Sequence, residues 1–304
     1  MSTGLEAEAL SWFFPAANGL RTSPCKGGIN NTVTYVDTSG GTRYVLRVSN
    51  NGNKTDKVAF EHEVLRQLSE QALSFQVPRA LPSKAGRPFE LLSNGAACCV
   101  WHLIPGALAG SGSIEAVGRA VGEVSTALAK VHVGRAAPNP PYCDLFVVHE
   151  ALAGDPQRFY QAVEQEAGLG GVRQEVGVLV GAVRRLEGRL ATLESLGLPK
   201  QLIHGDLHYD NILVSGGQVA GVLDFEFLAH DYRAMELAIA LSKYIGEDDP
   251  LQCCRQFMAG FAQHGRLTPE EQRVVPDLIQ LRILSNVVWF VGRAVAGEDS
   301  IASL

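Results

Sequence analysis

The chain has 304 residues, of which 46% are hydrophobic and 19% are charged, and its formal net charge is −6. This composition is that of a soluble globular protein with a well-filled core, and the length allows two lobes or one large domain. The acidic balance and the lack of any basic run argue against a nucleic-acid partner, because binding phosphates requires a basic face.

Cysteine usage and the chain's first residues bear on its compartment. The six cysteines have no C-x-x-C spacing and include two adjacent pairs, so we expect free thiols in a reducing environment. Residues 1–10 are acidic and carry no basic segment, which predicts that no signal peptide is present. The most apolar stretch, residues 96–110, contains Pro and Gly and is too short to span a bilayer. We therefore expect a cytoplasmic protein with no membrane partner.

The first hundred residues predict an antiparallel sheet with one main helix. Residues 31–36 and 42–48 are rich in β-branched and aromatic side chains and flank a Ser-Gly-Gly turn, which indicates a hairpin. Apolar residues then recur at helical spacing over 56–73. Two short apolar runs, 88–92 and 97–104, favour strands that complete the sheet.

A linker and a mainly helical region are predicted to follow. Pro105 begins a Gly/Ser-rich segment, and Ser113 is placed to cap the next helix. Further helices are expected over residues 172–196, 231–245, 251–264 and 268–295, with Pro276 kinking or splitting the last one, and short strands over 201–203, 212–214 and 219–223. These patterns predict an α+β fold with an N-terminal lobe (1–104), a linker (105–112) and a C-terminal lobe (113–304).

The most informative motif lies among those three short strands. Asp206 follows the first strand, Asn211 precedes the second, and Asp224 ends the third. Kinase-type phosphoryl transfer needs one carboxylate to accept the proton of the attacking hydroxyl, and an amide and a second carboxylate to hold Mg²⁺. The three residues therefore predict a catalytic base, Asp206, and two metal ligands, although each alone could be an ordinary loop residue.

Two nearby histidines leave a competing interpretation open. His204, Asp206 and His208 alternate as the ligands of a metal-dependent hydrolase would, although such a site needs further ligands from elsewhere in the fold. In kinase-like loops a His at position 204 braces the backbone, which is the role we favour for it.

The first lobe offers candidates for nucleotide binding. The segment Gly27, Gly28, Ile29, Asn30 and Asn31 precedes the hairpin and could bring backbone amides close to phosphates, although it matches no phosphate-loop signature. Arg47 lies in a strand where a cation would meet the α- and β-phosphates, with Glu61 on the next helix as its partner; each could equally be a solvated charge. Trp101, His102 and Leu103 are placed to offer backbone groups to an adenine ring, or to form a plain core strand.

Together these residues resemble the superfamily of aminoglycoside phosphotransferases and choline kinases, whose members share the protein-kinase fold. The resemblance follows the expected order along most of the chain, and "RYVLRV" and "HDYRAMELAIALSKY" are most similar to the branch that contains homoserine kinases; the matching segments are residues 27–31, 44–48, 61–68, 203–213, 223–225 and 231–240. It departs from the pattern where Arg47 replaces a common Lys, Glu226 replaces the Gly that protein kinases carry, and Glu236 replaces a common Asp.

The resemblance implies a bilobal fold, ATP and Mg²⁺ as cosubstrates, and transfer of the γ-phosphoryl group to a small-molecule hydroxyl. Homoserine or a similar amino alcohol is the preferred acceptor, and an aminoglycoside- or choline-type kinase is the alternative within the superfamily. A nucleotide-binding regulatory module without turnover is the alternative of another class. The expected acceptor-binding residues lie after the motif: Asp231, Arg282, Asn286 and Trp289.

Overall fold

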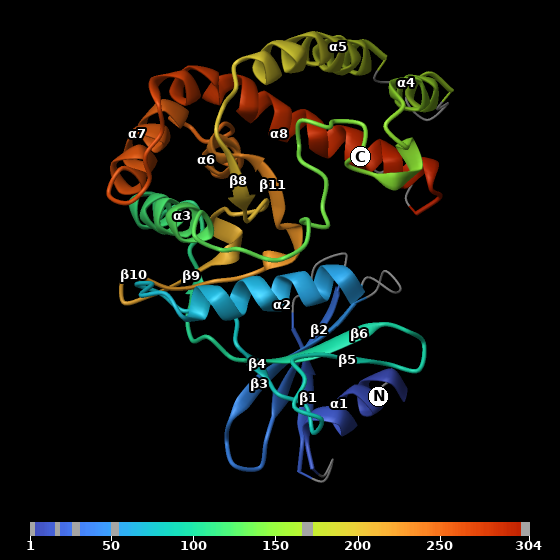
Figure 1. Cartoon of the computed structure of the whole chain (residues 1–304), viewed down its shortest axis with the longest axis vertical. Coiled ribbons are helices and arrows are strands. Elements are labelled where there is room, and N and C mark those ends of the chain that lie inside the picture. Colours follow the sequence, from blue (N-terminus) through green and yellow to red (C-terminus); the bar gives the residue numbers. More distant parts are fainter. Residues whose placement is uncertain (1–3, 16–18, 26–30, 50–54, 166–172, 299–304) are drawn as a thin grey trace. The chain divides into compact units, whose positions relative to one another are not determined.

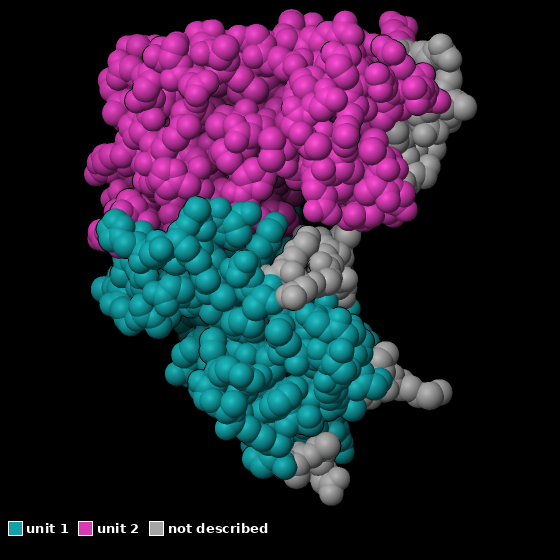
Figure 2. Space-filling view, turned by 45° about the vertical axis from the view of Figure 1, so that its right-hand side comes forward, with its two compact units in different colours: residues 1–109, 131–138, 210–226 teal, residues 110–130, 139–209, 227–304 magenta. Residues whose placement is uncertain are grey.

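The computed structural model describes residues 4–15, 19–25, 31–49, 55–165 and 173–298, which form two compact units (Figure 2). Unit 1 consists of residues 1–109, 131–138 and 210–226, and unit 2 consists of residues 110–130, 139–209 and 227–304. Each unit is thus built from segments that are not contiguous in the sequence. The division into lobes at residues 105–112 stays a prediction.

The main sheet of unit 1 is antiparallel and includes the predicted hairpin (Figure 1). Its strands run in the order β1-β2-β3-β6-β4, and β5 also pairs with β6; their bounds are β1 (Arg21–Pro24), β2 (Asn31–Asp37), β3 (Arg43–Ser49), β4 (Ala80–Leu81), β5 (Glu90–Leu91) and β6 (Ala97–His102). Gly41 in the hairpin turn has a φ of 79°, a conformation that glycine adopts without steric cost.

Alternation along β3 and β6 gives the sheet two different faces. Leu46 and Val100 point to the face that α1 (Gly4–Phe13) covers, and they share an apolar cluster with Phe13. Their neighbours in sequence, Arg47 and Trp101, point to the opposite face, where they contact α2 (Thr55–Ser69). The period of two therefore separates an apolar face from a face with charged and aromatic side chains. Helix α1 was not predicted from the sequence.

A second, smaller sheet brings the segment 210–226 into unit 1. Strand β9 (Ile212–Ser215) pairs on one side with β10 (Gln218–Val222) and on the other with β7 (Ala107–Leu108). Gln76 also forms backbone hydrogen bonds with Ala220 and Val222 of β10. Strand β7 lies within the predicted linker, so part of that segment is paired structure.

Unit 2 is mainly helical and contains one two-stranded ribbon (Figure 1). The ribbon is formed by β8 (Lys200–Ile203) and β11 (Ala229–Tyr232), and the helices are α3 (Ile114–Leu128), α4 (Pro156–Gln165), α5 (Arg173–Ser195), α6 (Arg233–Ser242), α7 (Pro250–Phe261) and α8 (Pro269–Val295). The helix predicted over 231–245 therefore begins later than expected, because Asp231 and Tyr232 pair with β8. Helix α8 continues through Pro276 and is not split.

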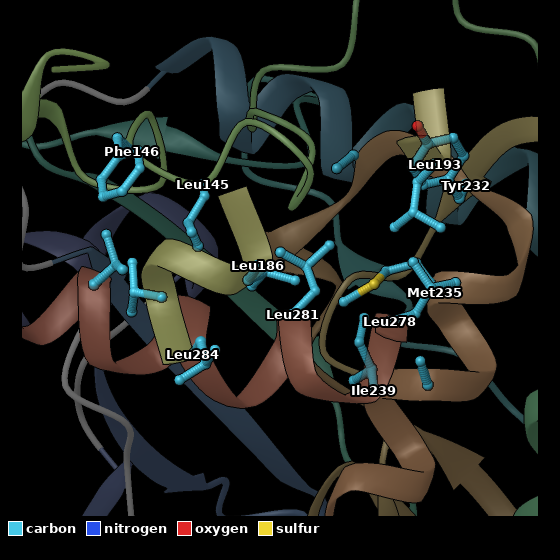
Figure 3. Close-up of a cluster of buried hydrophobic side chains, with 14 of the residues drawn as sticks. Leu145, Phe146, Leu186, Leu193, Tyr232, Met235, Ile239, Leu278, Leu281 and Leu284 are labelled. Carbon is cyan, nitrogen blue, oxygen red and sulfur yellow. The ribbon is translucent and has the colours of Figure 1, made fainter. Parts of the chain in front are cut away.

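The core of unit 2 forms where α8 packs against α5 and α6. Leu278, Leu281 and Leu284 of α8 lie against Met235 and other apolar side chains of the cluster (Figure 3). Burying each such side chain stabilises the fold by about 1.5–3 kcal/mol. By length and composition, α8 is the one helix in the described part of the chain that could cross a membrane, but a core helix passes the same test.

Candidate active site

An arginine–glutamate pair occupies the charged face of the unit 1 sheet. Arg47 donates from Nη1 to Glu61 Oε1 at 2.9 Å and from Nη2 to Oε2, so the pair is bidentate. The two side chains are only 13% and 4% exposed. Burial alone would lower the pKa of Arg47, but the charge of Glu61 outweighs it and holds this pKa well above the ordinary value. The sequence-predicted pairing of the two residues is therefore present in the structure.

Aromatic rings extend this cluster. The guanidinium of Arg47 lies over the Trp101 ring at 5.3 Å, and His62 stacks on the same ring at 4.6 Å between centroids. Burial, followed by the charge of Arg47, lowers the pKa of His62 to about 3, so the imidazole is neutral. The Trp101 side chain thus packs against Arg47 of the Arg47–Glu61 pair. Sequence reasoning missed His62, whose only signal was its place beside Glu61 on the inward face of an amphipathic helix.

The strand carrying Trp101 ends at the residues predicted to meet an adenine ring. The backbone N–H of His102 donates to Arg79 O at 2.9 Å, so this group is used within unit 1. Leu103 follows the end of β6 and is 39% exposed. The predicted adenine contacts of Trp101, His102 and Leu103 stay predictions.

The β9–β10 hairpin brings the two predicted metal ligands to the same end of one ribbon. Ile212 pairs with Val222, and the N–H of Leu223 donates to Asn211 O at 2.8 Å. Asn211 and Asp224 therefore both lie just beyond the Ile212–Val222 pair, at the open end of the hairpin. Asp224 has a φ of 64°, which is uncommon for a residue other than glycine and costs of order 1 kcal/mol or more. Such strain is typical of functional positions.

A hydrogen bond connects this end of the hairpin to the main sheet of unit 1. Asn31 Nδ2 donates to Glu226 Oε2 at 2.6 Å. The charge of Glu226 also raises the pKa of Arg47, although it contributes less than Glu61. Glu226 was identified from the sequence only as a departure from the protein-kinase pattern. The predicted phosphate-loop residues Gly27, Gly28 and Asn30 lie outside the described residues.

In unit 2, the loop that carries Asp206 has a tightly fixed backbone. Gly205 has a φ of 81°, and a Cβ at this position would lie 2.2 Å from Phe227 O, so only glycine fits. His204 is fully buried, and its Nδ1 accepts the backbone N–H of Asp206 at 3.3 Å. This is the bracing geometry expected of His204 rather than the geometry of a base.

Two buried carboxyl groups accept backbone N–H groups in this region, and the first of them holds the same loop. Glu236 Oε2 accepts the N–H of His204 at 2.6 Å, whereas its Oε1 has no partner among the described residues. Burial raises the pKa of Glu236 to about 8, against the opposing effect of backbone N–H groups. Asp231, predicted to bind the acceptor, is fully buried and accepts the N–H groups of Tyr142 and Tyr232. We therefore assign Asp231 a structural role.

Asp206 is held in an ion pair with a residue of α8. Arg282 Nη2 donates to Asp206 Oδ1 at 2.5 Å, and His208 Nε2 lies 3.4 Å from the same oxygen. Burial would raise the pKa of Asp206, but the hydrogen bond from His208 and the charge of Arg282 outweigh it and lower this pKa. Asp206 is therefore ionised at neutral pH, as a proton acceptor must be.

The other two predicted acceptor-binding residues lie further along α8. Arg282, Asn286 and Trp289 recur at helical spacing and so share one face of the helix. Asn286 is exposed, whereas the Trp289 ring is partly covered by Arg293, whose guanidinium lies 4.9 Å from it, and by the His149 ring. The roles of Asn286 and Trp289 stay predictions.

Among the described residues, no three His, Cys, Asp or Glu side chains are grouped as ligands for a metal ion. A zinc-dependent hydrolase needs such a group, whereas Mg²⁺ is held by one or two protein oxygens together with substrate phosphates. The oxygens of Asn211 and Asp224 fit the second description.

Comparison with known proteins places the chain in a family. The model of the phosphotransferase enzyme family matches residues 21–272. A homoserine kinase of Phenylobacterium zucineum is 25% identical over 270 residues, covering 83% of this chain and 73% of its own. A homoserine kinase of Neisseria meningitidis is 28% identical over 259 residues, covering 82% and 75%.

Solved structures show the same fold. A microcompartment-associated aminopropanol kinase superposes with a TM-score of 0.76 at 18% identity, covering 98% of this chain and 93% of its own. Aminoglycoside 2'-phosphotransferase-IIIa superposes with a TM-score of 0.64 at 17% identity, with the same coverage. The predictions of a kinase-like α+β fold and of a small-molecule kinase are thereby confirmed. The chain belongs to the phosphotransferase enzyme family.

Proposed function

We propose that the protein transfers the γ-phosphoryl group of ATP, with Mg²⁺, to a hydroxyl of a small amino alcohol, of which homoserine is the preferred one. The curated relatives that are homoserine kinases support this acceptor. We further propose that the protein is cytoplasmic and acts without a nucleic-acid or membrane partner, as the composition suggests.

The observation that carries the proposal is the paired end of the β9–β10 hairpin. The N–H of Leu223, the residue before Asp224, donates to Asn211 O there, in the same unit as the buried Arg47–Glu61 pair. An amide oxygen and a carboxylate oxygen are ligands that Mg²⁺ accepts. Asn211 and Asp224 would hold the ion, which would neutralise charge on the transferred group. Arg47, oriented by Glu61, would contact the α- and β-phosphates, and the backbone of Leu103 the adenine.

Asp206 supplies the proton acceptor in the proposed reaction. The acceptor hydroxyl gives its proton to the Asp206 carboxylate as its oxygen forms a bond to the γ-phosphorus, and the bond from that phosphorus to the β–γ bridging oxygen breaks. The products are ADP and a phosphate ester. A positioned carboxylate of this kind contributes about 10²–10⁴-fold in rate.

Two alternatives from other classes have less support. A metal-dependent hydrolase would use His204, Asp206 and His208 as ligands, but His204 is buried and its Nδ1 accepts a backbone N–H. A nucleotide-binding module without turnover would not need an ionised carboxylate held in an ion pair beside the loop. The alternative within the family, an aminoglycoside- or choline-type kinase, is distinguished from a homoserine-type kinase by the acceptor that it phosphorylates.

The test is ADP release with Mg²⁺ and a panel of homoserine, choline, other amino alcohols and an aminoglycoside. We expect acceptor-dependent release that is highest with homoserine. Asp206→Asn should lower kcat by about 10²–10⁴-fold with nucleotide affinity unchanged, whereas Asp248→Asn, an exposed control in unit 2, should have no effect. Absence of acceptor-dependent ADP from the wild type, or full activity of Asp206→Asn, would refute the proposal.

A further inference from the structure

Arg282 of helix α8 contacts the proposed base directly, through its ion pair with Asp206 in unit 2. Its Nη1 donates to Tyr142 Oη at 2.5 Å, and the Tyr142 hydroxyl donates to Gly205 O at 2.7 Å. The guanidinium also lies over the Tyr142 ring, 5.3 Å from its centroid. One side chain thus connects helix α8 to both the loop backbone and the carboxylate.

The position of Arg282 is set by the core of unit 2. Its neighbour Leu281, and Leu278 one turn earlier, are fully buried in the apolar cluster (Figure 3). These contacts fix the rotation of α8, so Arg282 projects from a rigid element rather than from a loop. Its side chain is 13% exposed, compared with 70% for Arg273 on the same helix. A guanidinium in this position loses little freedom when it binds a ligand.

The contacts of Arg282 leave donors for a ligand. Within the described part of the chain, the guanidinium makes hydrogen bonds only to Asp206 and Tyr142. An arginine carries more N–H groups than these two bonds use, in a planar arrangement that matches a carboxylate. The surroundings of the base therefore present a fixed positive charge with unused donors.

We propose that Arg282 binds a carboxylate of the acceptor and so makes the enzyme specific for hydroxy amino acids. This inference rests on the proposed function and narrows its acceptor class: amino alcohols without a carboxylate, and polycationic aminoglycosides, are poor acceptors. The carboxylate meets the free N–H groups of the guanidinium, while Asp206 remains beside the acceptor hydroxyl.

The expected size of the effect follows from the chemistry of the contact. Charge-assisted, bidentate arginine–carboxylate hydrogen bonds are about twice as strong as neutral ones. A site built to pair with a polar group rejects an analogue without that group strongly, because its own donors then stay unpaired. A cationic acceptor is disfavoured further by like-charge repulsion.

Two acceptors that differ only in the carboxylate give the sharpest test: homoserine and 3-amino-1-propanol. We expect wild-type kcat/KM to be about 30-fold or more higher for homoserine. Arg282→Gln should lower kcat/KM for homoserine by a similar factor, mainly through KM, and for 3-amino-1-propanol by only a few-fold. Arg273→Gln, which removes an exposed arginine from the same helix, is the matched control and should change neither value.

The outcomes separate this inference from the proposed function. Equal losses on both acceptors, carried by kcat, would show that Arg282 only positions Asp206, and the inference would be wrong. A wild type that phosphorylates 3-amino-1-propanol as well as homoserine would also refute it, with the proposed function intact and with no variant needed. No phosphorylation of either acceptor would instead refute the proposed function. Arg282→Lys, which keeps the charge, replaces Arg282→Gln if the latter does not fold.

Discussion

The two units each contain a nearly buried arginine–carboxylate pair, and the two pairs differ in which partner is left accessible. Arg47 and Arg282 are each 13% exposed, but the carboxylate of Glu61 is 4% exposed and that of Asp206 is 19% exposed. In unit 1 the carboxylate of Glu61 is the more buried partner, and under the proposed function it supports an arginine that would face the nucleotide. In unit 2 the carboxylate of Asp206 would itself accept the proton in the proposed reaction. The same ion pair therefore serves opposite purposes.

The structure that holds Arg47 in place also differs from the structure that holds Asp206 in place. Arg47 projects from a central strand and stacks on Trp101, so its position is set by the sheet and by aromatic packing. Asp206 lies on a loop whose backbone is fixed by Gly205 and by a hydrogen bond to Glu236. The proposed phosphate clamp thus relies on regular structure, whereas the proposed base relies on buried polar groups that hold a loop.

Removing the charge of Glu61 should produce the largest effect on stability and so test whether this carboxylate is a support. In Glu61→Gln the buried guanidinium of Arg47 loses its countercharge, and breaking such a pair typically costs about 3–5 kcal/mol. We expect the free energy of unfolding, measured from the first transition in denaturant, to fall by about 3 kcal/mol. Glu63→Gln on the same helix, whose partner Arg66 is exposed, is the control and should lose less than about 0.5 kcal/mol. A loss in Glu61→Gln no larger than in the control would contradict the comparison.

The sequence predicted most of the fold where a strong periodic pattern was present. The β2–β3 hairpin, α2, α3 and α8 appeared as expected because alternation and helical spacing report directly which face is buried. Helix α1 was missed, and the pairing of Asp231 with β8 was mistaken for a helix start. Both depend on tertiary contacts, since a two-strand ribbon between helices has no local signature.

The sequence supplied candidate site residues, but it predicted only one of the contacts that the structure shows between them. The Arg47–Glu61 contact was predicted because a kinase-type site pairs a phosphate-binding cation on a strand with a carboxylate on the following helix. The contacts of Arg282 with Asp206 and of Glu226 with Asn31 could not be predicted, because they join segments far apart in sequence. The neutral state of Glu236 depends on burial, which no single sequence reports.

Replacing Arg47 by Lys should have an intermediate effect, on nucleotide binding rather than on the acceptor. Lysine keeps the charge but loses the bidentate contact with Glu61 and the planar stack on Trp101. We expect the KM for ATP to rise about tenfold, or about 1.4 kcal/mol, with the KM for the acceptor unchanged. Arg43→Lys on the same strand, where the ion pair with Asp37 is exposed, should not change either value. A fall in kcat at constant KM for ATP would show that Arg47 does not clamp the nucleotide.

The smallest predicted effect tests how the Asp206 loop is supported, through the pH dependence of stability. Folding raises the pKa of Glu236 from 4.5 to about 8, because burial disfavours its charged form. The folded state therefore holds a proton that the unfolded chain releases, and stability falls as the pH rises towards 8. Asp231, with a pKa of about 6, makes the same contribution at lower pH.

Between about pH 6.5 and 7.5 the contribution of Glu236 can thus be isolated. Glu236→Gln is neutral at every pH and keeps an acceptor for the N–H of His204. We expect the free energy of unfolding of the wild type to fall by about 1 kcal/mol relative to this variant across the interval, because one pKa unit corresponds to about 1.4 kcal/mol. For Glu270→Gln, an exposed change in unit 2, the curve of unfolding free energy against pH should run parallel to that of the wild type. Parallel curves for Glu236→Gln as well would mean that Glu236 is ionised in the folded protein, and the loop would then be held by a buried charge instead of by a neutral acid.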